Sequence, residues 1–259
     1  MKASGLMIDL DGTIYKGGNI IPGAVEFVVS LKKRKIPFVF LTNNSASDRE
    51  HYFKKLRGMG LDIERNNILS STVSAVRYIK REFPGKKVFP LGTELFVREI
   101  VSNGIAVTDE CPDIVLLAFD KTITYEKLNK AYHFLLAGAE FIATHPDDLC
   151  PTEDAYDIDI GPFIRLLETM TGRTATITGK PNRLMVDIAA EAMGADPEGL
   201  WMIGDRLYTD IRMASDAGIS SVLVLSGETS AEDLGGSGYR PTAVRGSVSE
   251  MVGEFERRI

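Results

Sequence analysis

Short apolar runs alternate with longer amphipathic stretches along nearly the whole chain. The runs carry almost no charge, which is typical of strands that are buried on both faces of a parallel sheet. In the stretches between them, apolar residues recur every three or four positions, as in amphipathic helices. This alternation predicts an α/β fold with a doubly wound, mostly parallel, Rossmann-like sheet. The expected strands are 6–8, 36–41, 68–69, 87–91, 113–119, 140–144, 175–178, 200–203 and 220–225. The expected helices are 22–35, 47–59, 71–81, 93–102, 124–137, 161–170, 182–193, one that ends at 217 and a last one from about 248.

The first apolar run ends in a dense group of polar residues. Asp9 and Asp11 follow Leu6–Ile8 closely, and Gly12 comes next. Ligands of open α/β sheets bind outside the carboxyl ends of the strands, so these carboxylates are expected to face a crevice. Gly12 can bend the chain and turn Asp11 outward. Two carboxylates at one strand end are costly unless a cation joins them, and Mg²⁺ takes oxygen ligands of this kind.

The pattern Asp-x-Asp-Gly also occurs in tight turns and in calcium loops. A calcium loop of the EF-hand kind needs a Glu at its twelfth position and flanking helices. The segment after Gly12 reads Thr-Ile-Tyr-Lys-Gly-Gly, so this alternative fails. A simple turn stays open on these residues alone, and the decision depends on what the other strand ends carry.

Polar residues also follow three other expected strands. Thr42 and Asn43 offer a hydroxyl group and backbone donors. Lys180 lies between a strand and a helix, and its ammonium group and the helix N-terminus could both face an anion. Asp205 and Asp210 bracket a strand-to-helix turn. Together these residues provide acceptors for a cation and donors for a phosphoryl group at one edge of one sheet.

In this order the motifs resemble those of a known superfamily, the haloacid dehalogenase-like phosphatases. The four matching segments are Asp9-Leu10-Asp11-Gly12-Thr13, Leu41-Thr42-Asn43-Asn44, Gly179-Lys180-Pro181, and Gly204-Asp205 with Asp210. Phe141 to Asp147, Pro151-Thr152 and Thr209-Asp210-Ile211 are similar to the NagD/para-nitrophenyl-phosphatase branch. The resemblance covers nearly the whole chain. It implies a catalytic core formed by 1–80 and 174–259, with an α/β cap domain of 81–173 inserted between the second and third motifs.

The resemblance implies Mg²⁺-dependent hydrolysis of small-molecule phosphate monoesters through an aspartyl-phosphate. Asp9 would attack phosphorus, and Asp11 would protonate the leaving oxygen and later take a proton from water. Mg²⁺ would be held by the side chains of Asp9 and Asp205 and by the backbone carbonyl of Asp11. The implied phosphate-binding residues are Thr42, Asn43, Lys180 and Gly12, and the implied supporting residues are Asp210 and Asn44.

The chain departs from this branch in the cap. His145 stands where the branch usually has Asn, and the segment 157–161 replaces a more Gly- and Pro-rich one. His145 is expected either to face the substrate or to pack, and Asp147 either to contact the substrate or to form an Asx turn. The substrate therefore stays open among nucleoside monophosphates, sugar phosphates, phosphoglycolate and aryl phosphates such as 4-nitrophenyl phosphate. A homodimer contact through the cap is also left open.

Composition limits the classes of partner. The net charge is −6, and Lys and Arg form no stripe, so nucleic acid and anionic membranes are not expected as partners. The chain has no apolar run of about 20 residues and no secretory signal pattern. Cys111 and Cys150 have no metal or redox spacing, and we expect buried thiols in a reducing, cytoplasmic setting.

Two rival functions remain on the sequence alone. The same core can cleave carbon–halogen bonds, but that chemistry needs neither a metal nor a protonated leaving oxygen, so Asp11 and Asp205 favour the phosphatase. A non-catalytic regulator that binds a phosphorylated metabolite would need neither Asp9 nor Asp11.

Overall fold

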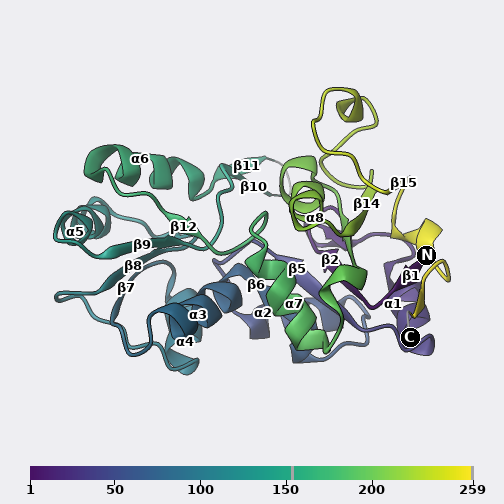
Figure 1. Cartoon of the computed structure of the whole chain (residues 1–259), viewed down its shortest axis with the longest axis horizontal. Coiled ribbons are helices and arrows are strands. Elements are labelled where there is room, and N and C mark those ends of the chain that lie inside the picture. Colours follow the sequence, from purple (N-terminus) through teal and green to yellow (C-terminus); the bar gives the residue numbers. More distant parts are fainter. Residues whose placement is uncertain (153–154, 258–259) are drawn as a thin grey trace. The chain divides into compact units, whose positions relative to one another are not determined.

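The computed structural model describes residues 1–152 and 155–257, which form two compact units (Figure 1). The first unit comprises Met1–Thr42, Tyr52–Leu69 and the chain from Lys180 onward, and the second comprises Asn43–His51 and Ser70–Gly179. Each unit is built on a parallel sheet with helices, so the α/β class that the sequence predicts is confirmed.

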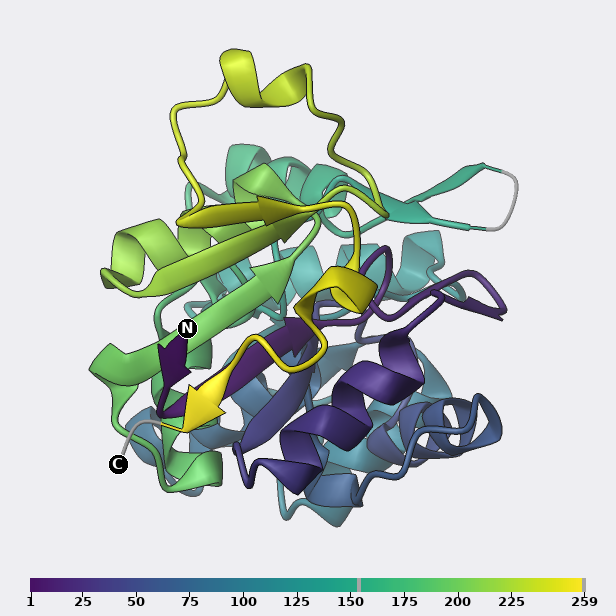
Figure 2. The same ribbon diagram turned by 90° about the vertical axis from the view of Figure 1, so that its right-hand side faces the viewer.

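The first unit contains a six-stranded sheet in the order β15-β14-β13-β2-β5-β6. Figure 2 shows β2, in purple, in the middle of this sheet. The bounds are β2 Gly5–Asp9, β5 Phe38–Thr42, β6 Ile68–Ser70, β13 Leu200–Gly204, β14 Ser220–Val224 and β15 Ala243–Arg245. All five residues of β2 and of β5 are buried, which explains why both segments are nearly continuous apolar runs.

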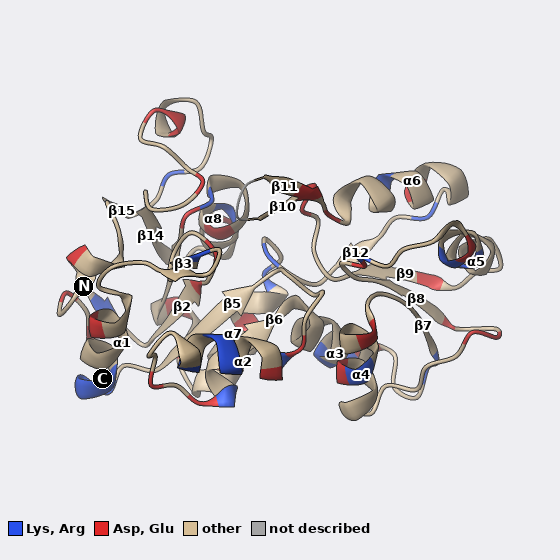
Figure 3. Cartoon of the chain, turned by 180° about the vertical axis from the view of Figure 1, so that it is seen from behind, with Lys and Arg blue, Asp and Glu red and all other residues tan. Residues whose placement is uncertain are grey.

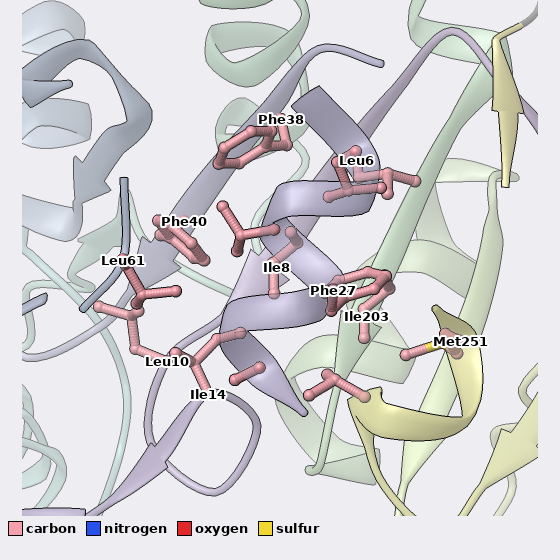
Figure 4. Close-up of a cluster of buried hydrophobic side chains, with 14 of the residues drawn as sticks. Leu6, Ile8, Leu10, Ile14, Phe27, Phe38, Phe40, Leu61, Ile203 and Met251 are labelled. Carbon is pink, nitrogen blue, oxygen red and sulfur yellow. The ribbon is translucent and has the colours of Figure 1, made fainter. Parts of the chain in front are cut away.

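Helices cover both faces of this sheet. Leu6 and Ile8 point to one face because side chains alternate along a strand, and there they join Phe27 and Phe40 in a buried cluster (Figure 4). Helices α1 and α2 contribute to this cluster, whereas α7 contacts β2 and β5. The bounds are α1 Ala24–Lys33, α2 Arg49–Gly58, α7 Leu184–Met193 and α8 Arg212–Ala217.

The second unit is a three-layer arrangement around a four-stranded parallel sheet in the order β12-β9-β8-β7. Helices α3 and α4 bury their apolar faces in one cluster, and α5 and α6 in another. The strands are β7 Val88–Leu91, β8 Ile114–Leu117, β9 Glu140–Ala143 and β12 Thr176–Ile177. The helices are α3 Ser71–Glu82, α4 Glu94–Ser102, α5 Tyr125–Leu136 and α6 Gly161–Thr171.

The second unit also holds the segment 43–51, which directly follows β5 in the sequence. Ser45 Oγ accepts a hydrogen bond from the Phe119 backbone N–H at 2.9 Å, and the Ala46 carbonyl accepts one from Thr93 Oγ1 at 2.8 Å. The insertion expected at 81–173 lies within this unit, which extends further, from Ser70 to Gly179. It extends further because α3 packs its apolar face into the same cluster as α4.

Several short elements differ from the expectation. The last helix expected from about 248 is wrong: only a 3-10 turn, η5 Val248–Met251, forms there. Gly253 follows at φ 81°, a left-handed conformation that breaks a helix. Two antiparallel hairpins were not expected, and neither was the pairing of the two end strands. The hairpins are β3 Tyr15–Lys16 with β4 Asn19–Ile20, and β10 Leu149–Pro151 with β11 Tyr156–Ile158; the end strands are β1 Lys2–Ala3 and β16 Glu256–Arg257.

Charged residues of both signs are spread over the helices of both units (Figure 3). In residues 1–152 and 155–257 there is no helix with both the length and the apolar character needed to cross a membrane. Cys111 is exposed, contrary to the expectation of a buried thiol, and Cys150 is partly buried.

Glu99 on α4 makes the stability of the second unit dependent on pH. Its carboxylate is 7% exposed and accepts a hydrogen bond from the Arg49 backbone N–H at 3.2 Å. Burial raises the pKa of Glu99 to about 7, although Arg49 opposes the shift. Because this value lies above the unfolded value of about 4.3, the contribution to stability is full below about pH 4.3 and is lost as the pH rises through 7.

We therefore expect Glu99→Gln to remove part of the pH dependence of unfolding. Between pH 5 and pH 8 the free energy of unfolding should fall by roughly 2 kcal/mol more in the original chain than in the variant. Urea unfolding of both proteins at the two pH values measures this difference, in which the other titrating groups cancel. An equal pH dependence in the two proteins would contradict the prediction.

Candidate active site

The carboxyl ends of three adjacent strands bring the expected residues to one edge of the first unit's sheet. Asp9 is the last residue of β2 and pairs in register with Leu41, so Thr42 extends one residue beyond it on β5. On the other side Ile203 pairs with Ile8, so Asp205 also lies just beyond the level of Asp9. Asp9, Thr42 and Asp205 are 7%, 3% and 2% exposed.

Lys180 joins two of the acidic residues. Its ammonium group donates to Asp9 Oδ1 and, at 2.7 Å, to Asp210 Oδ1, and the side chain is almost completely buried. One carboxylate oxygen from each of Asp9, Asp205 and Asp210 lies within 4.8 Å of the others. Three carboxylates around one ammonium group leave this buried cluster net negative when all are ionised.

The turn after β13 fixes Asp210. This π-helical turn, η3 Leu207–Ile211, brings the Asp210 carboxylate back so that its Oδ2 accepts from the Arg206 backbone N–H at 3.2 Å. A Cβ at Gly204 would lie 2.4 Å from Asp210, so only glycine allows this close return. The sequence predicts that Asp210 lies near the site. In the structure, its carboxylate contacts Lys180 and the backbone of its own turn.

Asp205 has one oxygen to which no described residue donates a hydrogen bond. Oδ2 accepts from the Glu228 backbone N–H at 2.7 Å, whereas the buried Oδ1 has no hydrogen-bond partner among the described residues. A Cβ at Gly12 or Gly227 would lie 2.3 or 1.9 Å from Asp205 Oδ2, so these glycines make room for the carboxylate. A buried carboxylate oxygen without a donor is expensive, and a hard divalent cation is the partner that this chemistry suits.

The pKa shifts of the buried carboxyl groups also favour a bound cation. Burial, together with the nearby Asp210 carboxylate, raises the pKa of Asp205 to about 7. Burial also raises the pKa of Asp9 well above its usual range, with Lys180 opposing and Asp210 and Asp205 adding to the rise. Burial disfavours the charge on Lys180, but Asp210 and Asp9 outweigh this and raise its pKa. An additional cation would therefore let the carboxylates stay ionised at neutral pH, so the residues fit Mg²⁺.

Asp11 lies next to this cluster and has partners that sequence reasoning missed. Tyr15 Oη donates to Asp11 Oδ2 at 3.1 Å. Burial raises the pKa of Asp11, and Lys55 is the strongest opposing cation. Lys55 lies 40 or more positions along the chain from both residues, so no local spacing could have revealed it.

Asn43 and Asp147 belong to the second unit, and they contact each other there. Asn43 Nδ2 lies 3.2 Å from both carboxylate oxygens of Asp147, and both side chains are buried. Asn44 accepts from the Ala46 backbone N–H at 3.0 Å through Oδ1, and its Nδ2 lies 3.6 Å from Cys150 Sγ. The second motif is thus divided, since Thr42 belongs to the first unit.

The two departures from the expected cap pattern meet in one buried network. His145 has no exposed surface; its Nδ1 lies 2.9 Å from Thr144 Oγ1 and its Nε2 lies 2.9 Å from Asp159 Oδ1. Thr144 Oγ1 in turn lies 2.9 Å from Ser45 Oγ. His145 thus lies in a buried hydrogen-bonded network, and its role in substrate specificity stays a prediction. Asp159 lies within the 157–161 segment, so the two departures are in direct contact with each other.

Comparisons with known proteins agree with the motifs. Residues 6–106 match the family model described as haloacid dehalogenase-like hydrolase, and residues 177–251 match the HAD-hydrolase-like model. The crystal structure of a 4-nitrophenylphosphatase from Thermotoga maritima is 39% identical and covers 96% of each chain with a TM-score of 0.93. Sugar-phosphatase AraL of Bacillus subtilis is 34% identical over 97% of this chain and 93% of its own length.

A third relative was solved with a metal ion. The glycerol phosphate phosphatase of Mycobacterium tuberculosis, crystallised in complex with magnesium, is 29% identical. The similarity covers 95% of this chain and 75% of that one, with a TM-score of 0.87. By its family models, its relatives and its fold, the chain belongs to the haloacid dehalogenase-like hydrolase family, in the branch of NagD and the 4-nitrophenylphosphatases.

Proposed function

We propose that this hydrolase cleaves small-molecule phosphate monoesters through an aspartyl-phosphate on Asp9. The observation that carries the proposal is the buried pair of Lys180 with Asp9 and Asp210, with the unsatisfied Asp205 oxygen in the same cluster. A carboxylate at this position is a suitable nucleophile, because attack on phosphorus divides one difficult displacement into two easier ones.

Lys180 has two tasks in this proposal. It holds the Asp9 carboxylate in place, and its ammonium group attracts the equatorial oxygens of the phosphoryl group, where charge resides in the transition state. Thr42, at the same sheet edge, offers a hydroxyl group to those oxygens. Asp210 keeps Lys180 charged and oriented, since it accepts one of the three ammonium hydrogens.

Asp11 is the proposed general acid and base. It must carry a proton when the substrate binds, and burial favours that protonated state. It would give this proton to the leaving oxygen as the ester bond breaks. It would then accept a proton from the water that hydrolyses the aspartyl-phosphate.

Asp9, Asp205 and the Asp11 backbone carbonyl are the groups that would hold Mg²⁺. The ion supplies a compact divalent charge that offsets the repulsion between a carboxylate nucleophile and a phosphate dianion. Asp210 is not proposed as a ligand, because both its oxygens already accept hydrogen bonds from Lys180 and the Arg206 backbone.

The proposed substrates are small phosphorylated metabolites on the scale of sugar phosphates. The relatives named sugar-phosphatase, acid sugar phosphatase and dihydroxyacetone phosphatase are 31–34% identical to this chain and support that class. Asp147 remains a proposed specificity residue of the second unit, held by Asn43.

Phosphate release from a panel of metabolites, with Mg²⁺ and with EDTA, tests the proposal. The panel contains sugar phosphates, dihydroxyacetone phosphate, glycerol 3-phosphate, nucleoside monophosphates, phosphoglycolate and 4-nitrophenyl phosphate. We expect turnover that requires Mg²⁺ and is lost in EDTA. Halide release from a haloacid without added metal would favour the dehalogenase alternative, and binding without phosphate release across the panel would favour the regulator.

A further inference from the structure

Asp11 has contacts that the proposed reaction does not yet use. Tyr15 Oη donates to Asp11 Oδ2, and the Lys55 Nζ atom lies 3.6 Å from the centroid of the Tyr15 ring. Tyr15 is 1% exposed, whereas Asp11 and Lys55 are partly buried.

The backbone and the core hold this arrangement in place. The Gly12 N–H donates to the Tyr15 carbonyl at 2.7 Å, which closes a tight turn and directs the Tyr15 ring back towards Asp11. Tyr52 and Leu56 flank Lys55 on α2 and lie in the same buried cluster as Tyr15. Lys55 therefore reaches the ring from a helix that is anchored in the core, and not from a mobile surface position.

We propose that Tyr15 and Lys55 are positioning residues: the Tyr15 hydroxyl occupies Oδ2 of Asp11 and so leaves Oδ1 as the oxygen that carries the transferable proton, and Lys55 holds the Tyr15 ring in place. This inference rests on the proposed function, in which Asp11 protonates the leaving group. A cation over the face of an aromatic ring is attracted to it electrostatically, so Lys55 holds the Tyr15 ring and, with it, the hydroxyl that donates to Asp11 Oδ2. The pair thus fixes both the rotation of the carboxyl group and the place of its proton.

How much the first step depends on the Asp11 proton is set by the leaving group. As Asp9 attacks phosphorus, the bond from phosphorus to the leaving oxygen breaks, and the proton on Asp11 Oδ1 moves to that oxygen to form the alcohol. Water then attacks the aspartyl-phosphate and returns a proton to Asp11 Oδ1, while phosphate leaves and the Asp9 carboxylate is restored. A phenolate leaving group needs the proton in the first step, whereas 2,4-dinitrophenolate departs without it.

The test is the ratio of kcat/KM for phenyl phosphate to that for 2,4-dinitrophenyl phosphate, because kcat/KM reports the first step alone. We expect Lys55→Met and Tyr15→Phe to lower kcat/KM for phenyl phosphate at least about tenfold, within the range of general acid catalysis. For 2,4-dinitrophenyl phosphate the loss should stay below about threefold. Lys55→Arg should restore the phenyl phosphate rate, and Lys54→Met, an exposed neighbour on α2, is the matched control.

The outcomes separate this inference from the proposed function. Equal losses on the two substrates would mean a merely structural role for Tyr15 and Lys55, and unchanged rates would mean no role; either result overturns the inference. Asp11→Asn is measured in parallel. If Asp11→Asn is selective for phenyl phosphate while Lys55→Met is not, only the inference fails. If Asp11→Asn affects both substrates equally, or if the unaltered protein releases phosphate from neither, the proposed function fails as well.

Discussion

Replacing Asp9 with asparagine is expected to abolish hydrolysis, with a loss in kcat on the order of 10⁴-fold or more. An amide has no carboxylate oxygen with which to attack phosphorus, and it also removes a proposed ligand of Mg²⁺. The side chain keeps its size, so the buried contact with Lys180 is retained in shape. Release of phosphate from 4-nitrophenyl phosphate with saturating Mg²⁺ measures the effect.

The same variant has an expected effect on stability. Asp9 is one of three buried carboxylates in the cluster, and its pKa is raised by burial and by Asp210 and Asp205. Neutralising it removes like-charge repulsion, so the melting temperature in EDTA should not fall and is expected to rise. A protein that melts normally yet turns over substrate at the ordinary Mg²⁺-dependent rate would refute Asp9 as the nucleophile.

Replacing Lys180 with methionine is expected to lower kcat by on the order of 10²–10³-fold, the cost of removing one donor to the transition-state charge. The change also leaves Asp9 and Asp210 buried without their cation, and breaking such a pair typically costs about 3–5 kcal/mol. Steady-state kinetics and urea unfolding measure the two effects separately.

A second substitution separates the two roles of Lys180. The double variant Lys180→Met with Asp210→Asn removes a charge of each sign, so it should regain much of the lost stability but none of the activity. Lys180→Arg keeps the charge and serves as the conservative comparison. Full activity in Lys180→Met, once its folding has been verified, would contradict a role for this ammonium group in catalysis.

The central sheet and the acidic cluster follow from the sequence for the same reason. Strands such as β2 and β5 are buried on both faces, so they stand out as apolar runs, and polar residues at their ends must then gather at one edge. The structure indeed brings Asp9, Asp205 and Lys180 together with Asp210. The roles of these residues stay predictions until the variants are measured.

The sequence could not predict features that depend on contacts between distant residues. Strands of two or three residues, such as β3 and β4, are too short to have a period. The contact of Lys55 with Tyr15 depends on how α2 packs, and the contact of His145 with Asp159 on how a hairpin folds back. The expected last helix failed because Val248 and Met251 are spaced as in a helix, but their burial needs only one short turn.

Residues 43–51 belong to the second unit, and this limits how chimeras of this protein with its relatives can be built. Ser45, Ala46 and Arg49 make hydrogen bonds to residues of the range 70–179. If only 70–179 were exchanged for the equivalent part of a relative, the segment 43–51 would stay behind and its hydrogen-bond partners would be replaced. Phe119, Thr93 and Glu99 would then come from one protein, whereas the segment 43–51 that they contact would come from the other. A chimera that keeps each unit intact therefore needs three crossovers on the N-terminal side, after Thr42, His51 and Leu69, so that the nine residues after Thr42 travel with the part they are bonded to.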